Sequence, residues 1–366
     1  MREEVILSVT VMAHPRRRER ASQLAARLQR FGATVAYDPE PDATPSAMRT
    51  AKLAWGSFNA AATHHMVIQE DAMLPQNFAA TVLKAISLQP NRLLSLCSDW
   101  TTRTGQAVRI AARQGRNWAP LCDLSVWAPA VVMPTAMVKG FINYLPSHPD
   151  DRDSVALLRY LELSGQFGLA PVPNLVQHDV PVSPSMWGRN IDQGVRRSAL
   201  FVDELEPDFF QNSDVAEFEV LPYIPLDRLM TTIGTPGPYG MYQLRPGVEW
   251  FGERGYTRDV LAAIFAETVD RALYAPLLEF VSAALLFQIW QTAFALGISS
   301  SVAPAHAMSP LLIHTANSTL LAGAMKRVFP VETIELVQSL LDSRWIDLGF
   351  RAGCEHRPRR ALLAAM

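Results

Sequence analysis

The segment His64-His65-Met66-Val67-Ile68-Gln69-Glu70-Asp71 joins a short apolar run to two adjacent carboxylates. Such a run is typical of a buried strand in a parallel sheet, which we place at residues 66–69. In open α/β sheets, ligands bind beyond the carboxyl ends of the strands. Glu70 and Asp71 are therefore expected at a ligand-binding edge, where paired carboxylates can hold a divalent cation and, through it, a diphosphate.

This acidic pair has a simpler alternative. Adjacent acids are also common in turns, where they cap the next helix or face solvent. The two histidines that precede the strand, His64 and His65, are expected at the opposite edge of the sheet, and we interpret them as structural.

The segments around this strand alternate between strand-like and helix-like patterns. Strands are expected at residues 5–13, 34–37 and 92–97, and helices at 17–31, 46–62 and 78–88. This order predicts an α/β fold with a mostly parallel sheet flanked by helices. The pattern continues less regularly with two strands within 119–133, helices at 135–144 and 151–163, and a strand at 174–177 that ends at His178.

The character of the chain changes after about residue 200. Residues 204–221 are acidic and aromatic, and the Gly- and Pro-rich segment 234–240 is typical of a loop. From residue 257 the pattern is helical, with helices expected at 260–273, 277–297, 309–329 and 331–341. We therefore divide the chain into an α/β domain at 1–200, a connection at 201–256 and a mainly helical C-terminal domain at 257–366.

Residues 280–298 approach the length of a membrane span. The segment contains Gln288, Gln291 and Thr292, and no basic cluster flanks it. We interpret it as a buried core helix and expect no stable membrane span.

Composition excludes several classes of protein. The chain has 366 residues and a net charge of −2, which argues against a nucleic-acid-binding face built on positive charge. Its three cysteines lie far apart, as expected in a reducing compartment, and they predict neither a zinc site nor a disulfide framework. The first residues lack the pattern of a signal peptide, so we expect a cytoplasmic location.

Four short motifs occur in a fixed order: VMAHP (11–15), VIQEDA (67–72), DRDSVAL (151–157) and PNLVQH (173–178). Together they resemble the GT-A-type nucleotide-sugar glycosyltransferases, in particular the group that contains the lipopolysaccharide and procollagen galactosyltransferases. The resemblance covers about residues 5–195 and depends on the order and spacing of the motifs. It implies a GT-A-like, Rossmann-like catalytic domain that uses a nucleotide-diphosphate sugar as donor.

The resemblance also implies a metal site. Asp71, Glu70 and the downstream His178 correspond to the residues that hold Mn or Mg against the donor diphosphate, and the alternative for His178 is a satisfied core or loop histidine. Oxygen ligands of this kind favour Mg or Mn over Zn. Gln69 stands where the family often has an acid, so it is expected to be a weaker ligand or to contact the ribose. Two alternatives remain: the protein holds the metal tightly by itself, or it holds the metal only when the nucleotide phosphates supply further ligands.

The nucleotide itself is assigned to residues near the first two strands. The resemblance implies that Ala13, His14 and Arg17 line the base and ribose. Asp38, after the second strand, is a candidate acceptor for a nucleobase or ribose, and Arg49 and Lys52 are candidates to face the diphosphate.

Two further segments carry the expected chemistry. In inverting members, a carboxylate at the start of the 151–163 helix removes the proton of the acceptor hydroxyl, which makes Asp153 the expected base and Asp151 the alternate. Acids in the first turn of a helix are also favoured by the helix dipole alone. The segment SPSMWGRN (183–190) resembles the family's mobile loop, with Trp187 to shield the donor and Arg189 to pair with the pyrophosphate.

These features predict a metal-dependent, inverting glycosyltransferase that moves a sugar to an acceptor hydroxyl on a small molecule, glycan or protein. A nucleotidyltransferase, a phosphohydrolase and a non-catalytic scaffold are the alternatives. The first of these would more often show a glycine-rich phosphate loop, which the segment at 13–15 lacks. The helical C-terminal half is expected to form the acceptor site or a homodimer interface.

Overall fold

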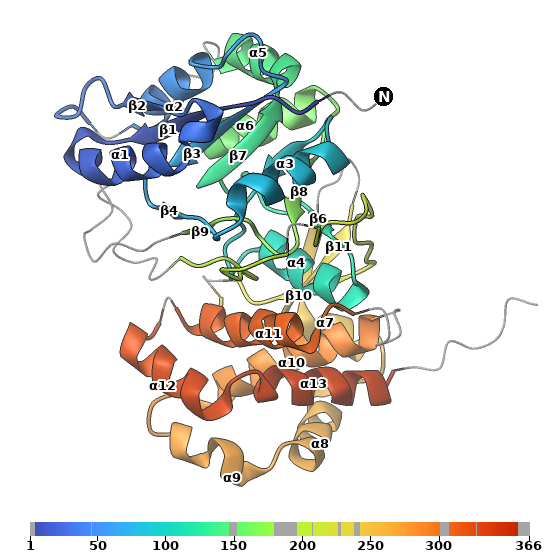
Figure 1. Ribbon diagram of the computed structural model, residues 1–366. Helices are drawn as coiled ribbons and strands as arrows, with labels where there is room; N and C mark the ends of the chain where they lie inside the picture. The colour runs from blue at the N-terminus through green and yellow to red at the C-terminus, as the bar shows by residue number, and fades with distance from the viewer. Residues whose placement is uncertain are drawn as a thin grey trace, which may run out of the picture. The chain divides into compact units, whose positions relative to one another are not determined.

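A seven-stranded sheet organises the N-terminal part of the chain (Figure 1). In the computed structural model, which describes residues 4–44, 46–145, 152–178, 196–206, 208–225, 228–237, 242–300, 307–326 and 328–357, the strand order is β2-β1-β3-β7-β5-β8-β6. These strands are β1 (Leu7–Ala13), β2 (Thr34–Tyr37), β3 (His64–Gln69), β5 (Leu93–Ser95), β6 (Trp118–Pro120), β7 (Ala130–Pro134) and β8 (Gly168–Pro171).

Most strands of this sheet run in one direction. β1 pairs in parallel with β2 and β3, and β5 pairs in parallel with β8. β7 is antiparallel to both β3 and β5, and β6 is antiparallel to β8. Five strands therefore share one direction, and the expected α/β class with a mostly parallel sheet is confirmed.

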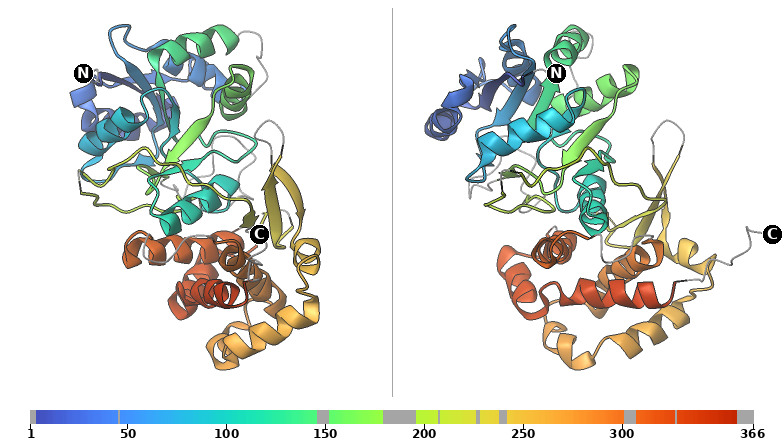
Figure 2. Two further views of the ribbon diagram at one scale, coloured as in Figure 1. Left: turned by 90° about the vertical axis from the view of Figure 1, so that its right-hand side faces the viewer. Right: turned by 45° about the vertical axis from the view of Figure 1, so that its right-hand side comes forward.

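Helices cover both faces of the sheet (Figure 2). Side chains alternate across a strand, so Val9, Val11, Met66 and Ile68 join one core cluster, while Met12 and Val67 join the other. The first cluster packs against α1 (Arg18–Arg27) and α3 (Phe78–Leu88). The second packs against α2 (Ala47–Gly56), α5 (Thr135–Tyr144) and α6 (Asp153–Leu163).

The start of β3 differs from the prediction. The strand begins at His64, so both histidines lie within it rather than before it. Each is buried, and His65 contacts the Ser8 hydroxyl at 2.8 Å and the Ala54 carbonyl at 3.1 Å. Burial lowers the pKa of both imidazoles, which keeps them neutral in the fold. These buried positions agree with a structural role. The strand is longer than predicted because a histidine whose ring nitrogens are hydrogen-bonded can occupy a buried position in a sheet.

The helix expected at 17–31 is divided into three pieces. A 3-10 turn (Pro15–Arg17) precedes α1, and a second one (Gln29–Phe31) follows it. The segment ends at Gly32, whose φ of +63° is the left-handed conformation that glycine adopts without steric cost.

The strand expected at 174–177 lies outside the main sheet. Its end forms β9 (Gln177–His178), which pairs antiparallel with β4 (Ala72–Met73) and places Ala72 opposite His178. The last parallel strand of the main sheet is instead β8, which was not predicted because four residues, Gly168 and Pro171 among them, carry little periodic signal.

The chain divides into two compact units, the first formed by Met1–Trp100 and Arg116–Ala216 and the second by Thr101–Gly115 and Glu217–Met366. This division differs from the expected boundaries at 200 and 256. Residues 201–216 belong to the first unit, and the second includes α4 (Arg103–Gln114) and a small antiparallel sheet. That sheet was predicted as a loop because β11 contains Gly234 and Pro236, residues that punctuate turns.

Helices form most of the second unit. The sheet comprises β10 (Leu221–Tyr223), β11 (Thr232–Pro236) and β12 (Tyr242–Pro246). The helices that follow it are α7 (Gly247–Gly252), α8 (Arg258–Thr268), α9 (Arg271–Tyr274), α10 (Ala283–Ser299), α11 (Pro310–Met325), α12 (Val331–Leu341) and α13 (Arg344–Glu355). A short 3-10 turn (Ala275–Leu277) links α9 to the next segment.

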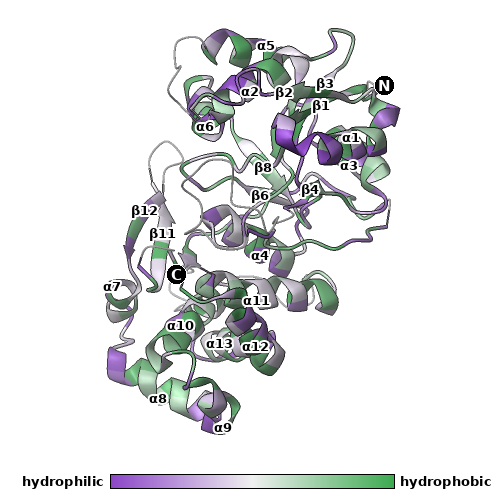
Figure 3. Ribbon diagram, turned by 90° about the vertical axis from the view of Figure 1, so that its left-hand side faces the viewer, coloured by the Kyte–Doolittle hydropathy of each residue, from purple (hydrophilic) through white to green (hydrophobic). Residues whose placement is uncertain are grey.

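The apolar segment at 280–298 forms α10, which is hydrophobic along most of its length (Figure 3). It packs along α13, where the Trp345 indole donates a hydrogen bond of 3.0 Å to the Leu286 carbonyl. In the part of the chain described here, no helix is both long and apolar enough to cross a membrane. The prediction of a buried core helix is confirmed.

Candidate functional site

Glu70 and Asp71 lie at the carboxyl end of β3, as the sequence predicts. The backbone N–H of Glu70 donates to the Met12 carbonyl at 3.2 Å, so the acidic pair begins where the β1–β3 ladder ends. The two side chains are only 11% and 10% exposed. Their burial excludes the alternative in which adjacent acids simply face solvent.

Arg17 contacts both acids. Its Nη1 lies 2.9 Å from Glu70 Oε1 and 3.2 Å from Asp71 Oδ2, and its side chain is 15% exposed. The 3-10 turn after β1 ends at Arg17, which brings the guanidinium across to the end of β3. The resemblance assigned this residue to the nucleotide, whereas in the structure it neutralises part of the acidic pair.

The acidic pair has unusual electrostatics. Burial, and next the negative charge of Asp71, raise the pKa of Glu70 to about 7, although Arg17 acts in the opposite direction. One guanidinium, that of Arg17, therefore contacts two carboxylates whose charges water screens poorly. The cluster consequently favours an additional positive charge.

His178 completes this cluster. Pairing of β4 with β9 places its Nε2 at 3.5 Å from Asp71 Oδ2. The other carboxylate oxygen, Asp71 Oδ1, is buried and has no hydrogen-bond partner among the residues that the structure describes. Because a buried carboxylate oxygen without a partner is costly, Oδ1 is a suitable ligand position for a cation.

A complete metal cage is not formed by protein groups alone. Among the residues that the structure describes, no three His, Cys, Asp or Glu side chains converge closely enough to hold a metal ion. Asp71, Glu70 and His178 lie together at the end of β3, and a divalent cation held there would need further ligands from phosphate and water. Mg²⁺ in particular is commonly held by one or two carboxylates and the phosphates of a substrate.

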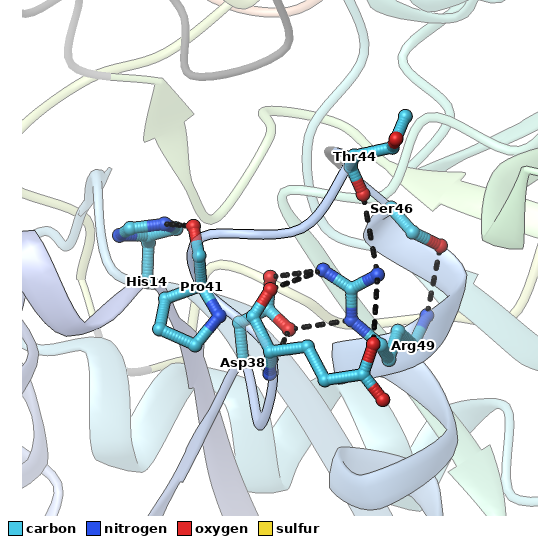
Figure 4. Close-up of polar contacts among 7 residues, drawn as sticks. His14, Asp38, Pro41, Thr44, Ser46 and Arg49 are labelled. Atoms are coloured by element: carbon cyan, nitrogen blue, oxygen red, sulfur yellow. Dashed lines mark hydrogen bonds and ion pairs between the residues drawn. The ribbon is translucent and has the colours of Figure 1, made fainter.

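Asp38 lies at the end of β2 and forms a two-bond ion pair with Arg49 (Figure 4). The pair causes a lowered pKa for Asp38, mainly through the hydrogen bond from Arg49. Arg49, which was a candidate to face the diphosphate, therefore holds the segment after β2. In the same view, His14 Nε2 lies 3.4 Å from the Pro41 carbonyl, and His14 Nδ1 accepts a hydrogen bond from the Arg16 backbone.

The other nucleotide candidates lie nearby in the same unit. Ala13 is buried at the end of β1, and its carbonyl accepts a hydrogen bond from the Asp38 N–H at 3.1 Å. Gln69 is partly buried, and its backbone N–H donates to Pro129. Lys52 is exposed on α2. Trp187 and Arg189 lie outside the described residues, as does Asp151.

Asp153 is the first residue of α6 and is buried. Burial raises the pKa of its carboxyl group, and the backbone N–H groups of Asp153 and Ser154 partly offset this effect. A raised pKa makes the carboxylate a stronger base, which suits the expected role.

The sequence interpretation missed two charged residues in this region. Asp99 is 2% exposed and follows β5, and its backbone pairs with Ser198. Arg196 lies with its guanidinium 5.3 Å from the centre of the Trp127 ring. Burial lowers the pKa of Arg196, while the charges of Asp99 and Asp71 act to raise it.

Asp99 could have been found from its pattern, because Ser98-Asp99 follows a buried strand just as Glu70-Asp71 does. Arg196 carries no such signal. The charge of Arg152, the residue before Asp153, acts with burial to lower the pKa of Arg196.

Comparison with known proteins adds no family assignment. No protein-family model matches the chain, and no curated protein matches it with significant similarity.

Proposed function

We propose that this protein is a metal-dependent glycosyltransferase that moves a sugar from a nucleotide-diphosphate donor to an acceptor hydroxyl, with inversion at the anomeric carbon. The observation that carries the proposal is the buried cluster of Asp71, Glu70 and His178 at the carboxyl end of β3. This is the edge at which α/β sheets bind nucleotides. The GT-A-like motif order of the sequence supports the same activity.

In this proposal Asp71 is the principal ligand of Mn²⁺ or Mg²⁺, because no described residue forms a hydrogen bond with its buried Oδ1. Glu70 and His178 assist it from the same edge. When bound, the cation supplies positive charge to the leaving diphosphate. The remaining ligands come from the donor phosphates, which agrees with the lack of a complete cage among the described side chains.

Arginines bind the donor phosphates. Arg17 and Arg196 both act on the Asp71 carboxylate, the first by direct contact and the second through its charge. Guanidinium groups bind phosphate in a two-bond geometry and stay charged at every working pH. Arg196 also packs on Trp127, which restricts its side chain and prepares it for binding.

The nucleoside is assigned to the segment after β2. Asp38 is held by Arg49 and by the Glu40 N–H, and a carboxylate still has lone-pair positions to accept a ribose hydroxyl. His14 lies across from this segment, against the Pro41 carbonyl. Ala13 and Gln69 end the two strands between these groups and the metal site.

Asp153 is the proposed general base. An alcohol is a weak nucleophile, and a positioned carboxylate that accepts its proton contributes about 10²–10⁴-fold in rate. Burial raises the pKa of Asp153, which makes its carboxylate a stronger base for this role. The proton of the acceptor hydroxyl moves to Asp153 as the new glycosidic bond forms and the bond to the diphosphate breaks.

A nucleotide-release screen tests the proposal. The full chain is incubated with UDP-, GDP- and dTDP-sugars and either Mn²⁺ or Mg²⁺, and release of the nucleoside diphosphate is measured with and without pooled acceptor alcohols. We expect metal-dependent release from at least one donor, abolished in Asp71→Asn and kept in the matched control Asp259→Asn, an exposed acid of the second unit. Failure to bind or turn over any donor would refute the proposal, and release of a sugar phosphate would favour a phosphohydrolase.

A further inference from the structure

Arg17 occupies the position in which the acidic pair would meet an added cation. Its Nη1 contacts both Glu70 Oε1 and Asp71 Oδ2, at 2.9 and 3.2 Å, and each of the three side chains is largely buried. The acidic pair therefore already has a positive partner supplied by the chain. His178 Nε2 lies at 3.5 Å from the same Asp71 oxygen.

A metal ion would compete with the Arg17 guanidinium for the negative charge of the Glu70 and Asp71 carboxylates. The guanidinium cannot lose its proton in a protein, so it cannot become neutral when a divalent cation approaches. Like charges repel strongly at short range in a poorly screened site. A cation that binds Asp71 Oδ1, the buried oxygen without a partner, is thus opposed by Arg17 as long as Arg17 stays on Oδ2.

A diphosphate removes this conflict. Its oxygens offer Arg17 the two-bond phosphate geometry that guanidinium groups prefer, while they also add ligands to the metal. Arg17 can then leave the carboxylates without losing a charged partner. The metal and the diphosphate should consequently bind together much better than either binds alone.

We propose that Arg17 is a built-in counter-cation that exchanges the Glu70 and Asp71 carboxylates for the donor diphosphate, and thereby makes metal binding depend on the nucleotide. This inference rests on the proposed function. It gives Arg17 a binding role and predicts that neither ligand is held strongly by itself.

The exchange is tested by metal binding rather than by turnover. Free Mn²⁺ is measured by electron paramagnetic resonance in the full chain, with and without saturating UDP, GDP or inorganic pyrophosphate. In the natural chain, we expect the diphosphate to tighten Mn²⁺ binding about 10–100-fold, and Mn²⁺ to tighten diphosphate binding by the same factor. In Arg17→Met, Mn²⁺ alone should bind about tenfold tighter, and the coupling should largely disappear.

Two matched variants isolate the charge. Arg16→Met removes a neighbouring guanidinium whose side chain is 74% exposed and lies 3.9 Å from the Asp42 carboxylate, so it should retain the natural coupling. Arg17→Lys keeps the positive charge and should retain part of the coupling between Mn²⁺ and diphosphate binding. Circular dichroism of each variant checks that the fold is intact.

The outcomes separate this inference from the proposed function. If the natural chain couples Mn²⁺ to UDP or GDP and Arg17→Met couples them equally, the exchange is refuted while the proposed function stands. If no nucleotide binds but Arg17→Met still tightens Mn²⁺ binding, the counter-cation role is supported and the donor class is wrong. Weaker Mn²⁺ binding in a folded Arg17→Met also refutes the exchange.

Discussion

The Asp38 carboxylate and the Arg49 guanidinium form a two-bond ion pair, with Nε to Oδ1 at 2.7 Å and Nη2 to Oδ2 at 2.8 Å. Arg49 also donates to the Glu40 and Thr44 carbonyls, and its N–H is capped by the Ser46 hydroxyl (Figure 4). One side chain thus fixes the whole connection between β2 and α2. This connection faces His14 and would hold the nucleoside in the proposed reaction.

Loss of this pair should lower stability in a pH-dependent way. The folded pKa of Asp38 lies below its ordinary value, so the stabilisation is present above about pH 3.9 and is lost as the pH falls through the folded pKa. We expect Arg49→Gln to lower the melting temperature by about 2–4 °C at pH 7. The difference should shrink at pH 3.

Thermal unfolding at the two pH values measures this effect. Arg16→Gln, which removes an exposed guanidinium, serves as the control and should not change the melting temperature. An equal loss at both pH values would mean that packing, not charge, supports the segment.

Substitution of the proposed base should reduce turnover without unfolding the protein. We expect Asp153→Asn to lower kcat by about 10²–10⁴-fold and to leave donor affinity nearly unchanged. It should also remove the acidic limb of the pH–rate profile, because that limb reports ionisation of the base. Stopped assays of nucleotide release across pH provide the measurement.

Asp99→Asn is the comparison for that experiment. Asp99 is also buried and follows β5 of the main sheet, but its charge acts on Arg196. It should weaken donor binding more than it lowers kcat. If Asp99→Asn lowered kcat more than donor affinity, and Asp153→Asn did the opposite, Asp99 rather than Asp153 would be the base.

Acid should destabilise the first unit through its buried histidines. Burial lowers the pKa of His65, so the unfolded chain takes up protons more readily below about pH 6.5. The stabilisation is fully present above that pH and is lost as the pH falls toward the folded pKa. His65→Gln should flatten the fall of unfolding free energy between pH 7.5 and 5.5, measured by urea denaturation. A slope unchanged from that of the natural chain would contradict this assignment.

Close packing of α10 on α13 depends on glycine. A Cβ at Gly353 would overlap the Phe294 carbonyl oxygen and lie 3.0 Å from Gly297 Cα, and backbone atoms cannot move aside cheaply. Gly353→Ala should therefore destabilise the second unit by about 1–3 kcal/mol. Gly252→Ala, in α7 of the same unit, meets no atom within 4 Å and should change stability by less than about 0.5 kcal/mol. Urea denaturation of both variants tests the contrast.

Elements with a regular pattern were predicted closely. The strand Thr34–Tyr37 and the helices Phe78–Leu88, Thr135–Tyr144 and Val331–Leu341 have the predicted bounds, because their apolar spacing and flanking turn residues agree. Elements stabilised by distant partners were missed. α4 is one of these, since its buried Arg109 donates hydrogen bonds to Ala316 and Thr319 of α11, more than 200 positions along the chain.

The candidate site shows the same division. Local pattern placed Glu70 and Asp71 at a strand end, and the structure brings His178 to them. Pattern could not show that Arg17 contacts both acids, because this contact joins residues more than fifty positions apart. For the same reason, Arg49 was assigned to the diphosphate although Asp38 holds it.

The placement of α4 in the second unit has a consequence for biosynthesis. Arg109 donates to the Ala316 carbonyl at 2.8 Å across a sequence separation of 207 residues. At translation rates of roughly 5–20 residues per second, α4 waits about 10–40 s on the ribosome before its partner helix is synthesised. During that interval the Arg109 guanidinium lacks the two α11 acceptors, Ala316 and Thr319, that it has in the folded protein.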